Sequence, residues 1–305
     1  MECYNAYPYF DDVFYLPKPF HLRIDKHEWR KSIINKQDKP CLFNLLKDEG
    51  DKHIGKNHLD YSFVNIKNDT LRGIKVTKEY RLHHATYKKD LQDNENLFRY
   101  EAISSGQSFM AIIKYKVELE QQMNDLMGKE RILYFGGSKG SGYGRSKMSD
   151  AAGQLNNYKE VKEKLGIKSA YINNADEIII TCLSDCLFRN NFGQPINHLS
   201  EEYLCELVGK KAILKKQFIQ TGQTEGFNTT WKARYPKETT VKAGSILQYV
   251  FPGGLTSDNI DKITDSLEEK LIGSRTQDGY GWLGVNINYP EELPEDLFME
   301  ERKRC

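Results

Sequence analysis

The sequence has no long apolar run and no segment with the features of an export signal. A helix needs about 18 to 20 consecutive apolar residues to cross a bilayer, and no stretch of the 305 residues provides them. The amino terminus also lacks a basic start followed by an unbroken apolar stretch, as a secretory signal would have. These absences predict a cytoplasmic protein with no membrane contact.

Cysteines are few and follow no framework spacing. The six are Cys3, Cys41, Cys182, Cys186, Cys205 and Cys305. Cys182 and Cys186 are four residues apart and do not form a C-x-x-C pair, and the nearest histidine, His198, stands alone. The pattern argues against a disulfide framework and predicts free thiols, buried strand cysteines, no metal site and no cofactor.

Net charge is nearly absent, because 44 Lys and Arg residues balance 43 Asp and Glu residues and leave +1. Such a total neither favours nor excludes a polyanionic partner. The distribution is uneven, with basic clusters between Arg72 and Lys89 and between Lys210 and Lys242, and acidic residues gathered after residue 290. Any single cluster is best explained as a solvated face. Together they predict one basic surface for phosphates and another face for protein neighbours.

The length suits two domains, and the clearest feature within it is an internal repeat. The first copy is predicted as Gly106, a strand over 110–117, a helix over 118–128, the segment 131–135 and a glycine-rich loop over 136–145. The second is predicted as Gly244, a strand over 248–251, a helix over 259–271 capped by Asp258, a loop over 273–282 and a strand over 283–287. The leading glycines precede Gly137 by 31 residues and Gly273 by 29. This spacing predicts two related units.

Each copy has the order of the second half of a ferredoxin-like unit. The second unit also has a predicted beginning, a strand at 177–183 and a helix at 201–208 capped by Ser200. The first has no clear beginning, so its opening strand is predicted to be missing or displaced, and a hairpin between Tyr61 and Tyr87 is predicted to project from it. The sequence thus predicts an α+β fold of tandem ferredoxin-like (RRM-like) units, 1–155 and 156–305, each with a glycine-rich loop before its last strand. The second unit ends in the acidic tail.

Both loops combine glycines, a cation and an aromatic ring. Glycine lets backbone N–H groups approach a phosphate, Lys139, Arg145 or Arg275 adds positive charge, and Tyr143 or Tyr280 offers a ring for base stacking. Neither loop has the order of a Walker motif, and neither opens a helix as G-x-G-x-x-G does. The combination favours single-stranded RNA as the ligand.

The second loop carries a carboxylate in Thr276–Asp278, a segment that is interpreted as an insertion relative to the first loop. Because an anion repels phosphate, Asp278 is predicted to pair with Arg275.

His83 and His84 are the one pair of histidines suited to acid–base chemistry on RNA. Alternation places them on opposite faces of a strand. Since no carboxylate or second base is visible beside either, RNA contact or packing is favoured over catalysis.

Three segments together resemble the RAMP superfamily (repeat-associated mysterious proteins) of CRISPR systems: NLFRYEAISSGQSF from Asn96, GGSKGSGYGR from Gly136 and IGSRTQDGYGWLGVN from Ile272. Within it, the chain is most similar to the Csx-ten-like subunit of type III-D complexes, a Cas-five-like RAMP, over residues 76–288. The resemblance implies tandem ferredoxin-like folds that grip the repeat-derived five-prime tag of the guide RNA (crRNA). It also implies that the chain caps an antiviral effector complex beside the large signature subunit and backbone RAMP subunits, while other subunits cleave the target.

The resemblance implies RNA-binding residues by motif and no catalytic residue. In the first loop they are Gly137, Ser138, Lys139, Gly142, Tyr143, Gly144 and Arg145. In the second they are Gly273, Ser274, Arg275, Gly279, Tyr280 and Gly281. Arg81 and His83, on a basic strand before the first loop, complete the set.

The chain departs from the family at its beginning. Family members open with a strand and a helix before a phrase like NAYPYF, which starts here at Asn5. The resemblance therefore predicts that the chain is a fragment or that another chain completes its first domain. Some RAMP proteins process guide precursors with a histidine, which keeps a metal-independent endoribonuclease as an alternative. A protein-only scaffold subunit is the third interpretation.

Overall fold

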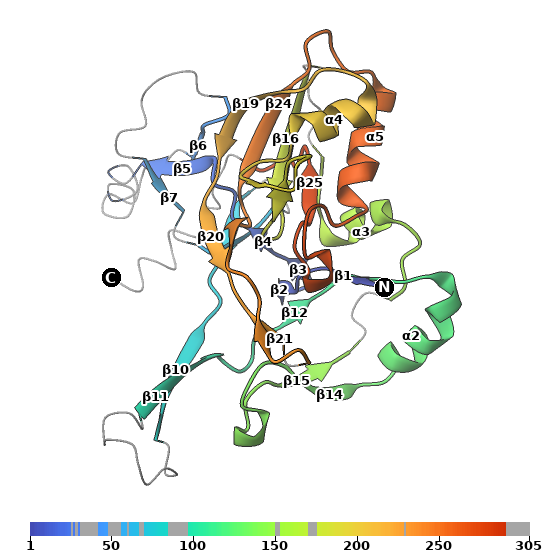
Figure 1. The fold of residues 1–305 in the computed structure, drawn as a ribbon. Coiled ribbons are helices and arrows are strands. Elements are labelled where there is room, and N and C mark those ends of the chain that lie inside the picture. Colours follow the sequence, from blue (N-terminus) through green and yellow to red (C-terminus); the bar gives the residue numbers. More distant parts are fainter. Residues whose placement is uncertain are drawn as a thin grey trace.

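The computed structural model describes residues 1–25, 27, 30, 42–47, 56–59, 61–66, 70–84, 97–149, 153–169, 176–228 and 230–290. The described chain is α+β, as predicted, with short antiparallel sheets and a few helices (Figure 1). Among these residues no helix is long and apolar enough to cross a membrane.

The second half contains one four-stranded antiparallel sheet in the spatial order β19-β24-β16-β25. Its elements are β16 (Glu177–Cys182), α4 (Glu201–Val208), β19 (Ile213–Phe218), β24 (Ile246–Val250), α5 (Ser257–Glu268) and β25 (Leu283–Val285). Their order along the chain is β-α-β-β-α-β, the order of a ferredoxin-like unit. Helices α4 and α5 lie together beside the sheet (Figure 1).

The apolar pattern of these segments explains the sheet. Ile178 and Ile180 of β16 point to the core and are fully buried, and Ile263 and Leu267, four residues apart on α5, cover the same core. The predicted buried thiols Cys182 and Cys186 lie in it as well.

One of the two predicted helix caps is confirmed and the other is wrong. The Ser200 side chain accepts a hydrogen bond from the Tyr203 N–H and caps α4, as predicted. The cap of α5 is Thr256 and not Asp258, because Thr256 and Asn259 form a reciprocal capping box that starts the helix earlier.

Insertions between the elements of this sheet form additional strands. A ribbon of β20 (Thr221–Thr224), β21 (Phe227–Asn228), β22 (Ala233–Arg234) and β23 (Glu238–Val241) separates β19 from β24. It runs down from the sheet in Figure 1. A smaller hairpin pairs β17 (Phe188–Arg189) with β18 (Pro195–Ile196).

The first half consists of small sheets. Its early strands are β1 (Glu2–Cys3), β2 (Tyr7–Phe10), β3 (Val13–Phe14), β4 (Leu16–Pro17), β5 (Leu22–Asp25), β6 (Leu42–Asn44), β7 (Lys56–His58), β8 (Phe63–Asn65) and β9 (Arg72–Ile74). Its later elements are β10 (Lys78–His84), β11 (Leu97–Ile103), β12 (Phe109–Met110), β13 (Ile113–Lys114), the 3₁₀ turn η3 (Val117–Leu119), α2 (Glu120–Met127), β14 (Arg131–Tyr134) and β15 (Arg145–Met148). The strand predicted over 110–117 is thus two short strands and a 3₁₀ turn. A four-stranded sheet like that of the second half is not among the described residues, and the tandem arrangement stays a prediction.

The amino-terminal strands pair with the first strands of the first repeat, but among the described residues none of them pairs with β15, the counterpart of β25. Strand β2 pairs with β12, and β1 pairs with β13, just as β16 pairs with β24. The other edge of β2 is occupied by β3, through Tyr9 and Phe14.

The projecting hairpin differs from the one predicted between Tyr61 and Tyr87. Strand β8 pairs with β9 within that range, but the hairpin that extends from the body pairs β10 with β11, from Lys78–Ile103 to His84–Leu97 (Figure 1). The residues between these two strands, 85–96, lie outside the described residues.

The two halves share a hydrophobic core. Trp282 is fully buried, with the ring of Tyr4 against its edge at 5.3 Å and the ring of Tyr7 stacked on it at 5.8 Å, measured between ring centroids. Its indole N–H donates to the hydroxyl of Tyr158, on α3 (Tyr158–Leu165), at 2.9 Å. The amino-terminal strands, the joining helix and the end of the second unit are therefore packed together.

Candidate nucleic-acid interface

The two glycine-rich loops have the same backbone conformation. Each contains a 3₁₀ turn, η4 (Lys139–Ser141) or η5 (Thr276–Asp278). A left-handed residue precedes each turn, Ser138 with φ 55° or Arg275 with φ 56°. A left-handed glycine follows each turn, with φ 83° in the first loop and 86° in the second. The loops therefore superimpose residue by residue, and Thr276–Asp278 is not an insertion.

This match corrects the predicted register by one residue. Gly136, at φ 78°, is the counterpart of Gly273, at φ 104°, whereas Gly137 is the counterpart of Ser274. Counting back from Gly-Tyr-Gly, which both loops share, gives this register from the sequence.

Gly144 and Gly281 close the two loops in the same way. The Phe135 N–H donates to the carbonyl of Gly144 at 2.9 Å, and the Ile272 N–H donates to the carbonyl of Gly281 at 2.8 Å. A Cβ on either glycine would overlap the carbonyl oxygen of the same partner. Both positions also have positive φ, so each closure requires glycine.

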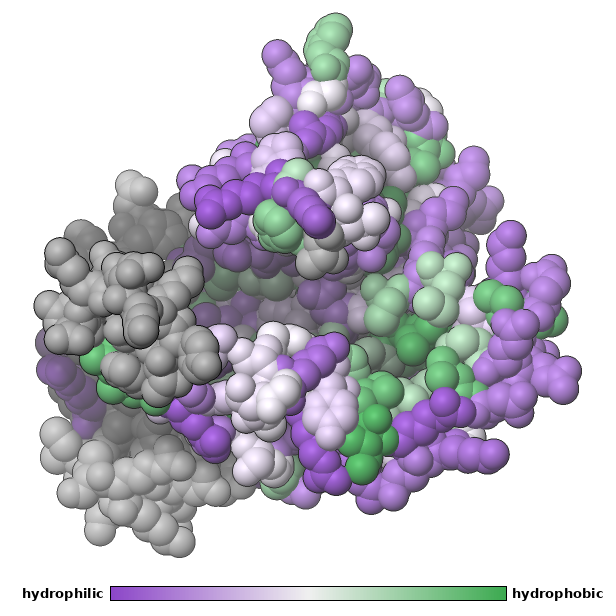
Figure 2. Space-filling view, turned by 60° about the horizontal axis from the view of Figure 1, so that its bottom comes forward, coloured by the Kyte–Doolittle hydropathy of each residue, from purple (hydrophilic) through white to green (hydrophobic). Residues whose placement is uncertain are grey.

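The first loop lies open to solvent. Lys139 and Arg145 are exposed, and no ion pair or side-chain hydrogen bond engages either one within the described part of the chain. Figure 2 brings this lower side of the molecule forward and shows a hollowed face with hydrophobic side chains gathered beside it. Two unpaired cations at a glycine-rich turn are suited to phosphate binding.

Tyr143 connects this loop to the β10–β11 hairpin. Its hydroxyl lies 2.6 Å from Nε2 of His83, and its ring contacts those of His83 and Tyr100. Phe98 stacks on His83 with a centroid distance of 5.6 Å. The result is a cluster of four rings, in which Phe98 and Tyr100 are 40% and 37% exposed.

Arg81 lies on the same face of the hairpin. Its guanidinium is 5.6 Å from the centroid of the Tyr143 ring, and it pairs with Glu79 at 3.1 Å. The structure thus brings together Arg81, His83 and Tyr143, which are distant in sequence. His84 occupies the next register position, opposite Leu97.

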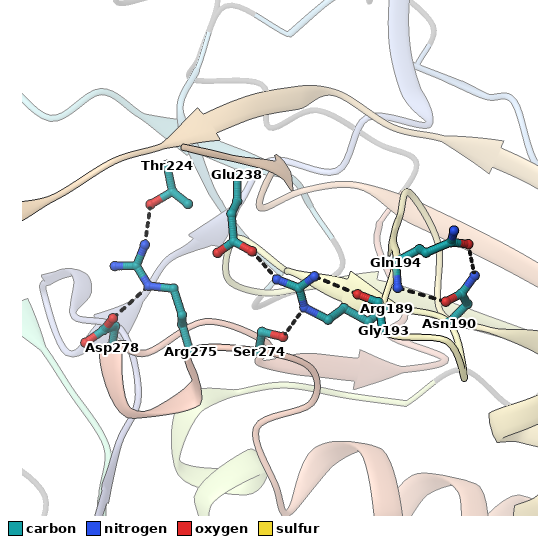
Figure 3. A network of polar contacts seen from close by, with 9 residues as sticks. All are labelled: Arg189, Asn190, Gly193, Gln194, Thr224, Glu238, Ser274, Arg275 and Asp278. Carbon is teal, nitrogen blue, oxygen red and sulfur yellow. Dashed lines mark hydrogen bonds and ion pairs between the residues drawn. The ribbon is translucent and has the colours of Figure 1, made fainter. Parts of the chain in front are cut away.

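The second loop is bound to its own unit (Figure 3). Arg275 donates to Asp278 at 2.9 Å, which confirms the predicted pair, and to Thr224 at 3.3 Å. Its guanidinium also lies over the rings of Tyr235 and Tyr280, and its side chain is only 16% exposed. The cation predicted for RNA is therefore committed to internal contacts.

Ser274 is held in the same network. Its hydroxyl accepts a hydrogen bond from Arg189 at 2.8 Å, and its N–H donates to the carbonyl of Leu187 at 3.0 Å. Arg189 also pairs with Glu238 and donates to the carbonyl of Gly193 (Figure 3). These contacts fix the loop to the β17–β18 hairpin and to β23.

Tyr280 mirrors Tyr143. Its hydroxyl lies 2.5 Å from Oγ1 of Thr224 on β20, so each Gly-Tyr-Gly tyrosine binds a hairpin strand that precedes its loop. Gly279 is buried beneath the amino-terminal segment near Asn5. Sequence reasoning missed Gly136, Phe98, Tyr100 and Thr224, although Phe98 and Tyr100 belong to the LFRYEA phrase that carries the resemblance.

No cluster of three metal-binding side chains occurs among the described residues. Comparison with known proteins found no matching family model and no matching curated protein. Among solved structures, the chain is similar to a chain in the cryo-EM structure of the Type III-B Cmr-beta bound to cognate target RNA, at 13% identity and a TM-score of 0.39, covering 87% of this chain and 67% of that one. A second match, in the Cmr-beta structure with cognate target RNA and AMPPnP, has 13% identity and a TM-score of 0.37, covering 87% and 69%. Both TM-scores are low, so these similarities carry no argument about the function of this chain.

Proposed function

We propose that the chain is a non-catalytic RNA-binding subunit of a type III CRISPR effector complex, which grips the five-prime repeat-derived tag of the guide RNA and caps the complex. The RAMP-like segments favour this family, and the proposal includes similarity to the Csx-ten-like subunits and a fold of tandem ferredoxin-like units. The observation that carries the proposal is the first loop: Lys139 and Arg145 have no partner among the described residues, and Tyr143 between them in sequence joins the ring cluster.

The contacts of the first loop suit a single strand. Cations and glycine N–H groups meet phosphates, while the partly exposed rings of Phe98 and Tyr100 offer faces to unpaired bases at about 1 to 3 kcal/mol each. The second loop would then position the RNA-binding parts through its internal contacts and contribute little charge, since Arg275 is paired with Asp278.

The test compares two double variants that remove equal charge. Lys139→Ala with Arg145→Ala should weaken retention of a single-stranded repeat RNA and reduce the slope of log affinity against log salt by about 1.4, at about 0.7 for each phosphate contact. Lys262→Ala with Lys270→Ala, at exposed positions of the second half, should leave the slope unchanged. Equal effects of the two pairs, or none from the first, would contradict the proposal.

An endoribonuclease is the second candidate, because His83 has a partner that the sequence did not reveal. Its Nε2 lies 2.6 Å from the Tyr143 hydroxyl, close enough to orient the ring for proton transfer. If purified protein cleaves repeat RNA at one position with chelator present, and His83→Ala abolishes the cleavage without loss of RNA retention, this candidate replaces the first. We expect no cleavage by either form.

A further inference from the structure

Strand β15 has one edge that pairs with β14 and one that faces away from it. The Phe135 N–H donates to the Gly144 carbonyl, and the ladder continues through Leu133–Ser146 and Arg131–Met148. Backbone groups alternate in direction along a strand. The N–H and C=O groups of Arg145 and Lys147 therefore point away from β14. Strands β14 and β15 form a sheet of two strands, so no strand among the described residues pairs with this outer edge.

The second unit shows what the same edge binds when it is filled. Trp282 and Gly284 are the counterparts of Arg145 and Lys147. The Trp282 carbonyl accepts a hydrogen bond from the Leu183 N–H at 2.7 Å, and Gly284 is in register with Thr181 of β16. The counterpart edge thus carries an antiparallel strand.

The side chains of the β14–β15 hairpin indicate the chemistry of a strand that would fit. The side chains of Arg145 and Lys147 lie on the same face of the hairpin as those of Ile132 and Tyr134, which are 52% and 45% exposed; this face is called the outer face. On the opposite face Ser146, Met148 and Leu133 are half-buried, whereas Arg131 is exposed. Figure 2 shows hydrophobic side chains on this side of the molecule. Only Glu130, which pairs with Lys147, offsets the positive charge of the outer face among the described contacts.

We propose that the outer edge of β15 accepts an extended strand from a partner protein, in which apolar residues alternate with acidic ones. Added antiparallel to β15, such a strand would place its acidic side chains beside Arg145 and Lys147 and its apolar side chains beside Ser146 and Met148. The inference comes from the repeat and its charges, and it competes with the proposed function for Arg145, which would meet an acidic side chain here and a phosphate there.

The probe is a synthetic peptide of alternating Ile and Glu, labelled for fluorescence anisotropy and added to the full chain. A peptide of alternating Ile and Lys serves as its matched control. Lys147→Pro removes the outward N–H without removing a bond to β14, and it should weaken binding of the Ile–Glu peptide about tenfold, as expected for one or two lost backbone hydrogen bonds. Lys147→Ala keeps that N–H and should weaken binding by less.

Residue-resolved hydrogen exchange on the unsubstituted protein gives a second measurement. The peptide should newly protect the amides of Arg145 and Lys147, whereas the amide of Ser146 is already bonded to β14 and should change little. Absence of Ile–Glu peptide binding, equal binding of the Ile–Lys peptide, or binding without this alternating protection would overturn the proposal. Protection of the same two amides by single-stranded RNA would assign the edge to RNA instead.

Discussion

The two glycine-rich loops have one backbone conformation and two opposite environments. In the first, Lys139 and Arg145 extend into solvent, while their counterparts in the second are Thr276 and the fully buried Trp282. Both loops close through the same glycine and the same kind of tyrosine hydrogen bond. The glycine pattern therefore sets the conformation of a loop, and the residues around it set whether it is available to a ligand.

The largest difference is expected from the closing glycines. Gly281→Ala would push its Cβ into the carbonyl of Ile272 inside the shared core, and should lower the free energy of unfolding by about 3 kcal/mol. Gly144→Ala meets the same clash in an exposed hairpin, which can open locally, so the global unfolding free energy should change little. Urea unfolding of both variants measures this. Equal losses would mean that the first loop is as integral to the core as the second.

Arg275→Ala should separate stability from RNA binding. It removes a charge-assisted bond to Asp278 and contacts with two tyrosine rings at a mostly buried site, which together are worth about 2 kcal/mol. Because its charge is already neutralised, the salt dependence of RNA retention should be unchanged. A slope reduced as much as in the Lys139 and Arg145 double variant would show that both loops contact phosphates.

Removing the two tyrosine hydroxyls sharpens the comparison further. Tyr143→Phe and Tyr280→Phe each lose one hydrogen bond, worth about 1 kcal/mol. We expect faster hydrogen exchange in β10 and β11 for the first variant, and in β20 and β23 for the second. A change of exchange in both hairpins from one substitution would indicate that the loops are coupled through the core.

The last expected effect concerns pH. In the second repeat Glu268 is the counterpart of Arg131, which lies in β14 and pairs with Met148 of β15. The Glu268 carboxylate accepts a hydrogen bond from the Val285 N–H of β25 at 2.8 Å and forms an ion pair with Lys162. Burial raises the pKa of Glu268 above its ordinary value, although Lys162 acts in the opposite direction. The folded protein then holds this proton more tightly than the unfolded chain, so the unfolding free energy should fall as pH rises from the ordinary pKa to the raised one, by at most about 1.4 kcal/mol per pH unit.

Glu268→Gln keeps an acceptor for Val285 but cannot titrate, and should remove this part of the pH dependence. Denaturant midpoints measured between pH 4 and pH 7 on both proteins provide the check. A slope that survives the substitution would assign it to other groups.

Local patterns in the sequence predicted the parts of the fold that depend on neighbours along the chain. The strand at 177–182, the Ser200 cap, the helices and the Arg275–Asp278 pair all depend on short spacings. The Thr256 cap was missed because Asp258 is an equally good capping residue, and the choice depends on where the chain enters the helix.

The environments of the loops were not predictable in this way. Leu187, Arg189 and Thr224 hold the second loop from positions 49 or more residues away in sequence, a distance that no local pattern covers. The projecting hairpin was placed too early for the same reason, since β10 finds its partner in β11 across residues 85–96.

The packing of Tyr4 and Tyr7 on Trp282 has a consequence for how the chain folds during synthesis. The Tyr4 hydroxyl bonds the carbonyl of Glu269, 265 residues later, and Tyr7 bonds the carbonyl of Leu183. During synthesis β1 and β2 can pair with β13 and β12 early, but the rings of Tyr4 and Tyr7 stay uncovered by the indole until the segment with Trp282 has been made. Closing so long a segment costs entropy before any contact is gained, so folding of the shared core is expected to be slow and to follow synthesis of the segment that contains Trp282.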